Sequence, residues 1–209
     1  MGLLITMEGP DGSGKTMQMD LLEKALREQG YPVVRSREPG GTPIGEAIRS
    51  VILNPEYKEM DAMTEALLYA ASRAQHVAEK IRPSMEQGAI VLLDRFLDSS
   101  LVYQGIGRGM TIETIEAINR FATGGLQPDT TLMVYIDYEE GLRRKKQQKG
   151  SLDRMEAQQD NFHRRVNEGY LQLAQRYPER IQLIDGDRDP QIIHQDILKR
   201  VKQLIQSRL

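Results

Sequence analysis

Residues 3–16 read LLITMEGPDGSGKT, an apolar run that passes directly into a glycine-rich loop. The loop completes the pattern G-x-x-x-x-G-K-[ST] with Gly9, Pro10, Asp11, Gly12, Ser13, Gly14, Lys15 and Thr16. Glycines at this spacing let backbone N–H groups curl around phosphate oxygens at the start of the next helix. We therefore predict an ATP-binding P-loop in which Lys15 reaches the β- and γ-phosphates and the Thr16 hydroxyl ligates Mg²⁺. The alternative is a chance match in a glycine-rich turn, but the apolar strand before the loop and the amphipathic helix after it count against that.

Short apolar segments alternate with long amphipathic ones along the rest of the chain. Compact apolar runs predict strands, and a 3.6-residue apolar period predicts helices. The predicted strands are 3–7, 31–36, 89–93, 131–136 and 181–184. The predicted helices are 15–29, 42–53, 61–87 with a candidate break at Pro83, 112–122, 139–146, 158–177 and a closing helix from Asp189-Pro190. Repeated strand–helix–strand units predict an α/β fold whose parallel sheet is covered by helices on both sides.

The bulk composition is typical of one globular domain spanning residues 1–209, because no repeat, low-complexity tract or Ser/Pro-rich linker divides the chain. The net charge of −2 and the pI near 6.0 argue against a general nucleic-acid-binding protein, which usually carries a basic surplus. The sequence has no cysteine, which excludes disulfides and cysteine-based metal sites and fits a cytoplasmic location. Its longest apolar run, residues 89–93, is too short to cross a membrane.

Charged side chains follow two of the predicted strands directly. Asp94-Arg95 comes after the strand 89–93, and the segment 37–41 (REPGG) follows the second strand. In open parallel sheets the carboxyl ends of the strands form the ligand-binding edge, so we expect both segments to lie near the P-loop. An aspartate at this position can hold the Mg²⁺ shell, and we predict this role for Asp94. A strand-end cap with a surface arginine and a plain turn are the simpler alternatives.

Five segments together make the sequence resemble the thymidylate kinase family, in its bacterial form, over essentially the whole chain. They are 8–16 (EGPDGSGKT), 37–42 (REPGGT), 68–73 (LYAASR), 94–105 (DRFLDSSLVYQG) and 152–156 (LDRME). The resemblance implies a P-loop nucleoside monophosphate kinase fold with a five-stranded parallel sheet and a short lid near residues 143–155. It also implies a homodimer that uses ATP and Mg²⁺ to convert dTMP to dTDP in dTTP biosynthesis.

The resemblance also implies roles for residues at the phosphate end of the substrate. Arg37, Arg49 and Arg95 would grip the dTMP phosphate, with Arg95 bridging donor and acceptor. Asp94 would organise Mg²⁺ and these arginines, and Asp11 would meet the 3′-hydroxyl. A phosphate monoester is already largely a dianion at neutral pH, so it needs cations and no general base. Positioning and charge stabilisation should therefore supply nearly all of the catalysis.

For the base, the resemblance implies that Tyr69 stacks on thymine and Arg73 donates to its O4 atom. Ser100 and Gln104 would read the remaining base edge, and Tyr103 would crowd the 2′ position and disfavour ribonucleotides. Ordinary helix packing is the alternative for each tyrosine taken alone. The three histidines lie outside the matched motifs and are more typical of surface or packing positions than of catalysts: His76, His163 and His194.

A local basic cluster, residues 143–146 (RRKK) with Lys149 and Arg154, falls in the implied lid. A solvated helix face is the simplest interpretation of such a run. Some family members carry a key arginine in the P-loop, where this chain has Gly12, so the lid should supply the charge, and Arg144 and Arg154 are the preferred carriers. Related bacterial lids hold arginine at several places where this chain has Lys146, Gln148 and Lys149. Which lid residue contacts the γ-phosphate therefore stays open, since lysine lacks the bidentate fork.

Two other function classes are compatible with a P-loop alone. A kinase for a different nucleoside monophosphate is the nearest, and preference for dCMP, UMP or AMP would identify it. A nucleotide-dependent switch or DNA-associated ATPase is the second, and it should hydrolyse ATP without an acceptor. The near-neutral charge and the resemblance in the thymine-pocket motifs argue against the second class.

Overall fold

The computed structural model describes residues 2–146 and 153–208 of the chain. Within them, five strands form one sheet in the order β2-β3-β1-β4-β5, and each paired neighbour runs parallel. The strands are β1 (Leu3–Glu8), β2 (Val33–Arg37), β3 (Ile90–Asp94), β4 (Thr130–Tyr135) and β5 (Ile181–Asp185). The predicted parallel α/β sheet is confirmed, with strand bounds that shift by one or two residues.

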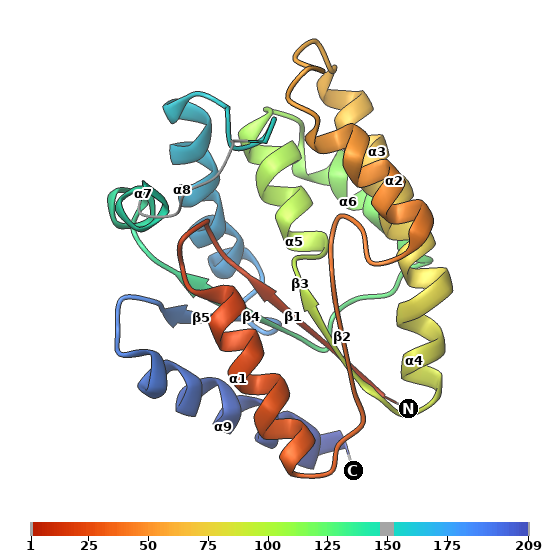
Figure 1. The fold of residues 1–209 in the computed structure, drawn as a ribbon, viewed down its shortest axis with the longest axis vertical. Coiled ribbons are helices and arrows are strands. Elements are labelled where there is room, and N and C mark those ends of the chain that lie inside the picture. Colours follow the sequence, from red (N-terminus) through yellow and green to blue (C-terminus); the bar gives the residue numbers. More distant parts are fainter. Residues whose placement is uncertain (1, 147–152, 209) are drawn as a thin grey trace.

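Helices connect the strands and cover the sheet, as Figure 1 shows. They are α1 (Lys15–Glu28), α2 (Pro43–Leu53), α3 (Ala62–His76), α4 (Arg82–Glu86), α5 (Leu97–Ser100), α6 (Ile112–Thr123), α7 (Tyr138–Lys146), α8 (Asp160–Arg176) and α9 (Pro190–Arg208). Two π-helical segments, η1 (Val77–Ile81) and η2 (Leu101–Gly107), continue α3 and α5. Among the described residues, no helix combines the length and the apolar character needed to span a bilayer.

Two helical regions differ from the prediction. The chain stays helical over most of 61–87, but the irregularity is the π segment at residues 77–81, and Pro83 is tolerated in the first turn of α4. Residues 97–107, for which no element was predicted, are also helical. The glycines there weaken the local helix signal, yet they allow close packing, since a Cβ on Gly107 would lie 2.7 Å from the ring of Phe162.

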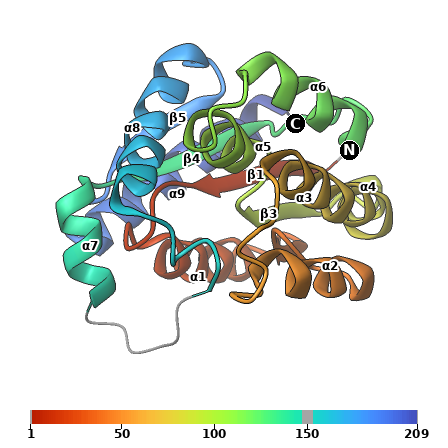
Figure 2. The same cartoon turned by 90° about the horizontal axis from the view of Figure 1, so that it is seen from above.

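Alternating side chains of the central strand face the two layers of helices, because successive strand residues point to opposite faces. Leu3, Ile5 and Met7 of β1 pack with α1 and α9. Leu4 faces the other layer and packs with η1 and α4. Figure 2 shows the two layers from above, with α1 on one side of the sheet and α5, α6 and α8 on the other.

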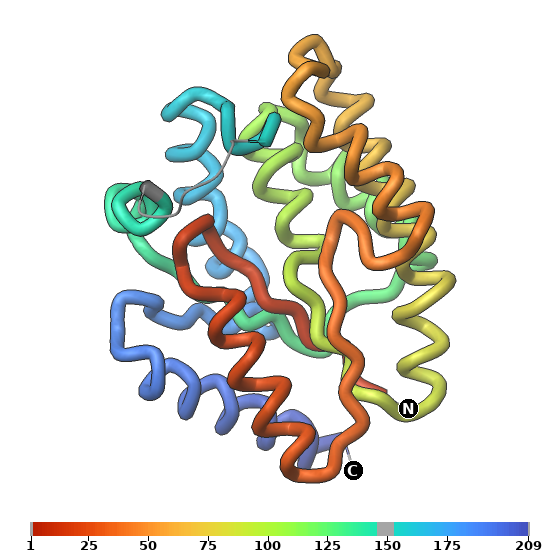
Figure 3. The backbone as a smooth tube through the Cα atoms, viewed as in Figure 1, coloured from red at the N-terminus to blue at the C-terminus, as the bar shows by residue number. Residues whose placement is uncertain are grey.

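The carboxyl ends of the parallel strands meet at one edge of the sheet, which positions the site. The backbone trace in Figure 3 follows β1 through the tight loop of residues 9–14 into α1, which runs back along the sheet. Register pairs Met7 of β1 and Arg37 of β2 with Asp94 of β3, so all three strands end at the same level. The loops after these strands are therefore neighbours, as predicted.

Candidate active site

The P-loop adopts a backbone that its glycines make possible. Gly9, Gly12 and Gly14 have positive φ angles of 137°, 80° and 91°, where L side chains are strained. A Cβ on Gly9 would also lie 2.0 Å from the backbone oxygen of Val134, so no larger residue fits there. The loop thus turns tightly between the end of β1 and the start of α1.

The Lys15 side chain folds back over the loop, and its ammonium group binds the backbone at the start of the loop. Its Nζ atom donates to the backbone oxygens of Gly9 at 3.0 Å and Pro10 at 2.7 Å. Burial and the nearby Arg95 lower the pKa of Lys15 to about 8. Removal of water and a like charge both disfavour the ammonium form, so this amine is poised to gain stabilisation from a polyanionic ligand.

Arg95 joins the end of β3 to the P-loop. Within residues 2–146 and 153–208, it is the non-glycine residue with a positive φ, 66°, and this conformation turns its side chain back toward the loop. Its Nη1 atom donates to the Tyr170 hydroxyl at 2.7 Å and its Nη2 atom to Asp11 Oδ1 at 2.6 Å. Burial alone would raise the pKa of Asp11, but Arg95 and Lys15 hold that pKa well below its usual range. The pair is therefore fully ionised.

Two adjoining cavities open at this edge of the sheet. The first, which we call the acceptor cavity, has a volume of about 250 Å³. It is lined by all of the residues predicted to bind the substrate: Asp11, Arg37, Arg49, Tyr69, Arg73, Arg95, Ser100, Tyr103 and Gln104. The second, the triphosphate cavity, has a volume of about 760 Å³ and is lined by residues 11–18 with Arg144, Lys145 and Arg188. Asp11, Asp94, Arg95 and Glu156 line both, so these four residues form the boundary between the two cavities.

The closed end of the acceptor cavity is built around Arg73, which is 1% exposed. Its Nε atom donates to Glu38 at 2.8 Å, its Nη1 atom to Ser100 Oγ at 3.0 Å and to Asn119 Oδ1 at 2.6 Å, and its Nη2 atom to the backbone oxygen of Phe96 at 3.0 Å. A guanidinium has five N–H donors. One Nη2 hydrogen is left without an acceptor among the described residues and can donate to a ligand.

At the open end of the cavity, two arginines are held loosely. Arg37 pairs with Glu46 at 3.0 Å and keeps about half of its side chain exposed. Arg49 donates to the backbone oxygen of Pro39 at 2.9 Å. Each guanidinium has N–H donors without a partner among the described residues. Both side chains can therefore bind an anion without breaking a buried ion pair.

Oxygen donors for a divalent cation lie on the P-loop side. Thr16 is exposed at the start of α1, and Asp94 ends β3; both line the triphosphate cavity. Among the described residues, no group of three or more carboxylate, histidine or cysteine side chains could hold a metal by itself. Mg²⁺ commonly takes one or two carboxylates plus water and substrate phosphates. The residues present therefore fit a Mg²⁺ ion that arrives with a nucleotide.

The predicted lid residues lie in different places. Arg144 lines the triphosphate cavity and donates to Asp187 at 2.8 Å and to Glu140 at 2.5 Å. Arg154 does not lie there: it is 4% exposed and is paired with Glu65 at 2.7 Å, which holds its charge away from the P-loop. Gln148 and Lys149 lie outside the described residues, as does the side chain of Lys146.

Lys145 reaches the P-loop, although Arg144 and Arg154 were the lid residues predicted to supply the charge there. Its Nζ atom lies 3.3 Å from Asp11 Oδ2 and 3.1 Å from Glu156 Oε1. Gly141, one turn earlier, packs on the loop, since a Cβ there would lie 2.9 Å from the Asp11 backbone oxygen, a contact that only the fold reveals. Lys145 is on the same face and therefore points at the loop.

Three residues to which the sequence assigned no role, Glu8, Ser99 and Tyr170, form a hydrogen-bond network that holds Arg95. Glu8, fully buried at the end of β1, accepts from the Phe96 N–H at 2.7 Å and from the Ser99 N–H and Oγ at 3.2 and 2.6 Å. Ser99 also accepts from Arg95 at 3.1 Å. The charged residue at the end of an apolar strand could have indicated Glu8. Nothing in the local sequence indicates Tyr170, which lies in a helix 75 residues away from Arg95.

A P-loop joined to a second, arginine-lined cavity across a shared boundary defines the class of P-loop kinases that act on small phosphorylated acceptors. The family model described as Thymidylate kinase matches residues 7–197, and the chain belongs to this family. It is similar to the thymidylate kinase of Exiguobacterium sibiricum, with 50% identity over 99% of this chain and 97% of the relative. It is also similar to that of Bacillus velezensis, with 46% identity over 99% and 98%.

A solved structure has the same fold. The crystal structure of thymidylate kinase from Ehrlichia chaffeensis matches with a TM-score of 0.77 and 32% identity, over 96% of this chain and 98% of that one. The family expected from the five sequence motifs is thus confirmed, together with the P-loop kinase fold.

Proposed function

We propose that this chain transfers the γ-phosphate of ATP to dTMP and forms dTDP and ADP, as one kinase domain in dTTP biosynthesis. The observation that carries the proposal is the shared boundary of the two cavities, because Asp94 and Arg95 line both. A triphosphate on the P-loop and a monophosphate in the acceptor cavity would meet at these residues. The membership of the chain in the thymidylate kinase family supports the same reaction.

The acceptor phosphate binds to arginines. Arg37 and Arg49 at the open end supply cations, and Arg95 at the boundary contacts both phosphates. The monoester is the nucleophile in its dianionic form, so no side chain needs to remove a proton. Charge neutralisation and in-line positioning supply the catalysis. Lys15, whose amine gains anionic neighbours when ATP binds, holds the β- and γ-phosphates.

The closed end of the acceptor cavity selects the base and sugar. Tyr69 stacks on the pyrimidine, and the remaining Nη2 hydrogen of Arg73 donates to O4 of thymine. Ser100 and Gln104 contact the rest of the base edge. The ring of Tyr103 lies under Arg95, with 5.3 Å from the guanidinium carbon to the ring centre, and it excludes a 2′-hydroxyl. Asp11 meets the 3′-hydroxyl.

Thr16 and Asp94, which line the triphosphate cavity, would hold a Mg²⁺ ion that arrives with ATP. When bound, this ion would neutralise charge on the phosphates of the nucleotide. Arg144 and Lys145 provide the lid charge over the triphosphate, because both line its cavity, whereas Arg154 is paired with Glu65.

The protein acts as a cytoplasmic homodimer without nucleic-acid or membrane partners. Support for the dimer comes from large apolar side chains exposed on α2, α3 and α6. Phe121 of α6 is 92% exposed, Ile44 of α2 is 54% exposed and Leu67 of α3 is 52% exposed. These helices are neighbours, since α3 contacts both α2 and α6, and exposed apolar side chains on neighbouring helices are typical of a surface that a second subunit covers.

A coupled assay for ADP with purified protein, ATP and Mg²⁺ tests the reaction. The acceptor panel is dTMP, dCMP, dUMP, UMP and AMP, with an acceptor-free control. We expect the highest kcat/KM with dTMP and almost no ADP without an acceptor. Preference for another monophosphate would replace dTMP as the substrate, and acceptor-independent hydrolysis would favour a nucleotide switch.

A further inference from the structure

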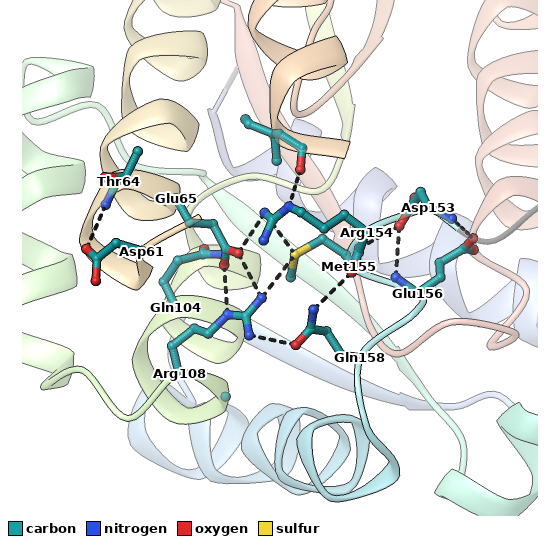
Figure 4. Close-up of polar contacts among 12 residues, drawn as sticks. Asp61, Thr64, Glu65, Gln104, Arg108, Asp153, Arg154, Met155, Glu156 and Gln158 are labelled. Atoms are coloured by element: carbon teal, nitrogen blue, oxygen red, sulfur yellow. Dashed lines mark hydrogen bonds and ion pairs between the residues drawn. The ribbon is translucent and has the colours of Figure 1, made fainter. Parts of the chain in front are cut away.

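A buried carboxylate, Glu65, lies next to the base end of the acceptor cavity and has no assigned role so far. It is 0% exposed and accepts hydrogen bonds from three side chains. Gln104 Nε2 donates at 2.9 Å, Arg108 Nη2 at 2.8 Å, and Arg154 Nη2 lies at 2.7 Å. Figure 4 shows these groups converging on Glu65: Gln104 and Arg108 come from η2 and the residue directly after it, and Arg154 comes from the segment before α8.

The chemistry of this contact fixes the orientation of the Gln104 amide. An ionised carboxylate can only accept hydrogen bonds, so the NH₂ group of Gln104 must face Glu65. The amide oxygen then points the other way. No donor among the described residues reaches this oxygen, and Gln104 lines the acceptor cavity together with Arg73 and Ser100. Gln104 thus offers the cavity a hydrogen-bond acceptor and not a donor.

The two arginines keep this orientation from reversing. A protonated Glu65 could donate to the Gln104 oxygen and allow the amide to flip. Burial alone would raise the pKa of Glu65, but the hydrogen bonds from Arg108, Gln104 and Arg154 and the charge of Arg108 lower this pKa overall. Glu65 therefore stays ionised at neutral pH.

The arginines are themselves held in place. Arg154 Nε donates to the backbone oxygen of Ile52 at 2.6 Å. Arg108 Nη1 donates to Gln158 Oε1 at 2.7 Å, and Gln158 Nε2 donates to the backbone oxygen of Arg154 at 3.0 Å (Figure 4). These bonds form a closed ring around Glu65, so the carboxylate cannot easily turn away from Gln104.

We propose that Glu65 is a specificity-determining positioning residue: it holds Gln104 with its amide oxygen toward the base and so makes the site accept thymine and reject cytosine. The proposal rests on the proposed function of the acceptor cavity. Thymine presents N3–H as a donor beside the O4 acceptor, and it pairs with the Gln104 oxygen and with Arg73. Cytosine presents N3 as an acceptor and N4–H₂ as a donor. Cytosine N3 would therefore face the Gln104 oxygen, with two acceptors opposed, and its N4–H₂ would face the Arg73 guanidinium, with two donors opposed. Neither side chain can rotate to relieve the mismatch.

The test compares kcat/KM for dTMP and dCMP in the intact protein. The main variant is the double substitution E65Q/R154M, which removes one carboxylate and one cation together, so that the net charge of the cluster is unchanged. Arg108, which is partly exposed, loses its carboxylate partner but keeps its hydrogen bond to Gln158. Glutamine at 65 can donate or accept, so the Gln104 amide can turn. We expect the dTMP/dCMP ratio to fall about tenfold, the effect of one hydrogen bond of reversed polarity.

Two further variants keep the proposal falsifiable. R154M alone leaves Glu65 paired with Arg108, so it should lower the melting temperature without changing the dTMP/dCMP ratio. Gln104→Leu removes the amide and leaves the Glu65 ion pairs intact, so it should fold and lower the ratio as much as the double variant. Urea unfolding of each protein verifies that the comparison is made on folded material.

An unchanged ratio in folded E65Q/R154M, an unchanged ratio in Gln104→Leu, or an equal fall in R154M alone would overturn the proposal. If E65Q/R154M does not fold, Gln104→Leu and R154M decide the outcome. The proposed function fails separately, because it predicts that the unmodified protein already prefers dTMP to dCMP. A wild-type preference for dTMP with no change in the variants would remove only the role of Glu65.

Discussion

Arg95 Nη2 donates a 2.6 Å hydrogen bond to Asp11 Oδ1, and this bond links the end of β3 to the acidic residue of the P-loop. The two side chains line both cavities, so the residue that binds the acceptor phosphate also contacts the loop that binds the donor. The left-handed backbone of Arg95, with φ of 66°, aims its side chain at the boundary. Strain of this kind is retained where the surrounding structure holds a functional group in place.

The first prediction concerns Arg95 itself. Arg95→Ala removes the guanidinium from the boundary, and we expect kcat to fall on the order of 10³-fold or more, as when a transition-state arginine is lost in other phosphoryl-transfer enzymes. Alanine bears the same positive-φ cost as arginine, so that strain is unchanged. Lys24→Ala on the exposed face of α1 is the matched control. Near-normal turnover of folded Arg95→Ala would contradict the proposed role.

The second prediction follows from the pKa of Lys15, which burial and Arg95 lower to about 8. As the pH rises through this value the free enzyme loses the ammonium that should bind the phosphates. We therefore expect kcat/KM for ATP, which reports on the free enzyme, to fall on the alkaline side with an apparent pKa near 8. The assay varies ATP from pH 6.5 to 10 at a dTMP concentration well below its KM, so that the profile reports on the enzyme free of both substrates.

Lys15→Arg provides the control for this pH profile, because arginine stays protonated throughout the range. Its activity should be lower but without the alkaline fall near pH 8. If the same limb remains in Lys15→Arg, another group causes it. Lys15→Ala should abolish transfer at every pH while the protein stays folded.

The third prediction concerns Tyr103, whose ring lies between Arg95 and Phe162 in the acceptor cavity. Tyr103→Ala opens space beside the 2′ position, so the preference for dTMP over its ribose counterpart should narrow by about tenfold or more. Tyr103→Phe keeps the ring and should keep the ratio. Competing the two monophosphates in one reaction measures the ratio directly. An unchanged ratio in Tyr103→Ala would remove this residue from sugar selection.

Much of the fold could be predicted because its signals are local. The P-loop pattern, the apolar strands and the helical periods of residues 15–29 and 158–177 all correspond to observed elements. Residues 97–107 could not be predicted in this way. Gly105 and Gly107 weaken the local helix signal, and the segment is helical because these glycines pack closely on α6 and α8.

In the site, too, the features that depend on contacts between distant segments could not be predicted from the sequence. All of the residues predicted to bind the substrate line the acceptor cavity, but the sequence did not show how these residues are held. Arg154 lies in a matched motif and was expected over the triphosphate. Its actual partner, Glu65, is 89 positions away in the sequence, and only the three-dimensional fold brings them together. Lys145, one residue from the preferred Arg144, faces the P-loop because of helix phase.

The last prediction concerns the pH dependence of stability. Burial, and then the charge of Asp98, raise the pKa of Glu8 from 4.5 to about 7. Between these two values the folded protein binds a proton at Glu8 that the unfolded chain releases. Stability from this group is therefore present below pH 4.5 and is lost as the pH rises to about 7. The contribution of Asp11 to stability depends on pH in the opposite direction: its pKa is lowered in the folded state, so its contribution is lost as the pH falls.

Glu8→Gln isolates this contribution. Glutamine is isosteric: its oxygen can accept from the N–H groups of Phe96 and Ser99, and its NH₂ can donate to Ser99 Oγ. The free energy of unfolding of the wild type minus that of Glu8→Gln should fall by about 2 kcal/mol between pH 5 and pH 8. Urea denaturation at both pH values gives this difference, in which the other titrating groups cancel. A difference that stays constant or rises with pH would show that Glu8 is ionised throughout, because its bonds to Phe96 and Ser99 would then outweigh its burial.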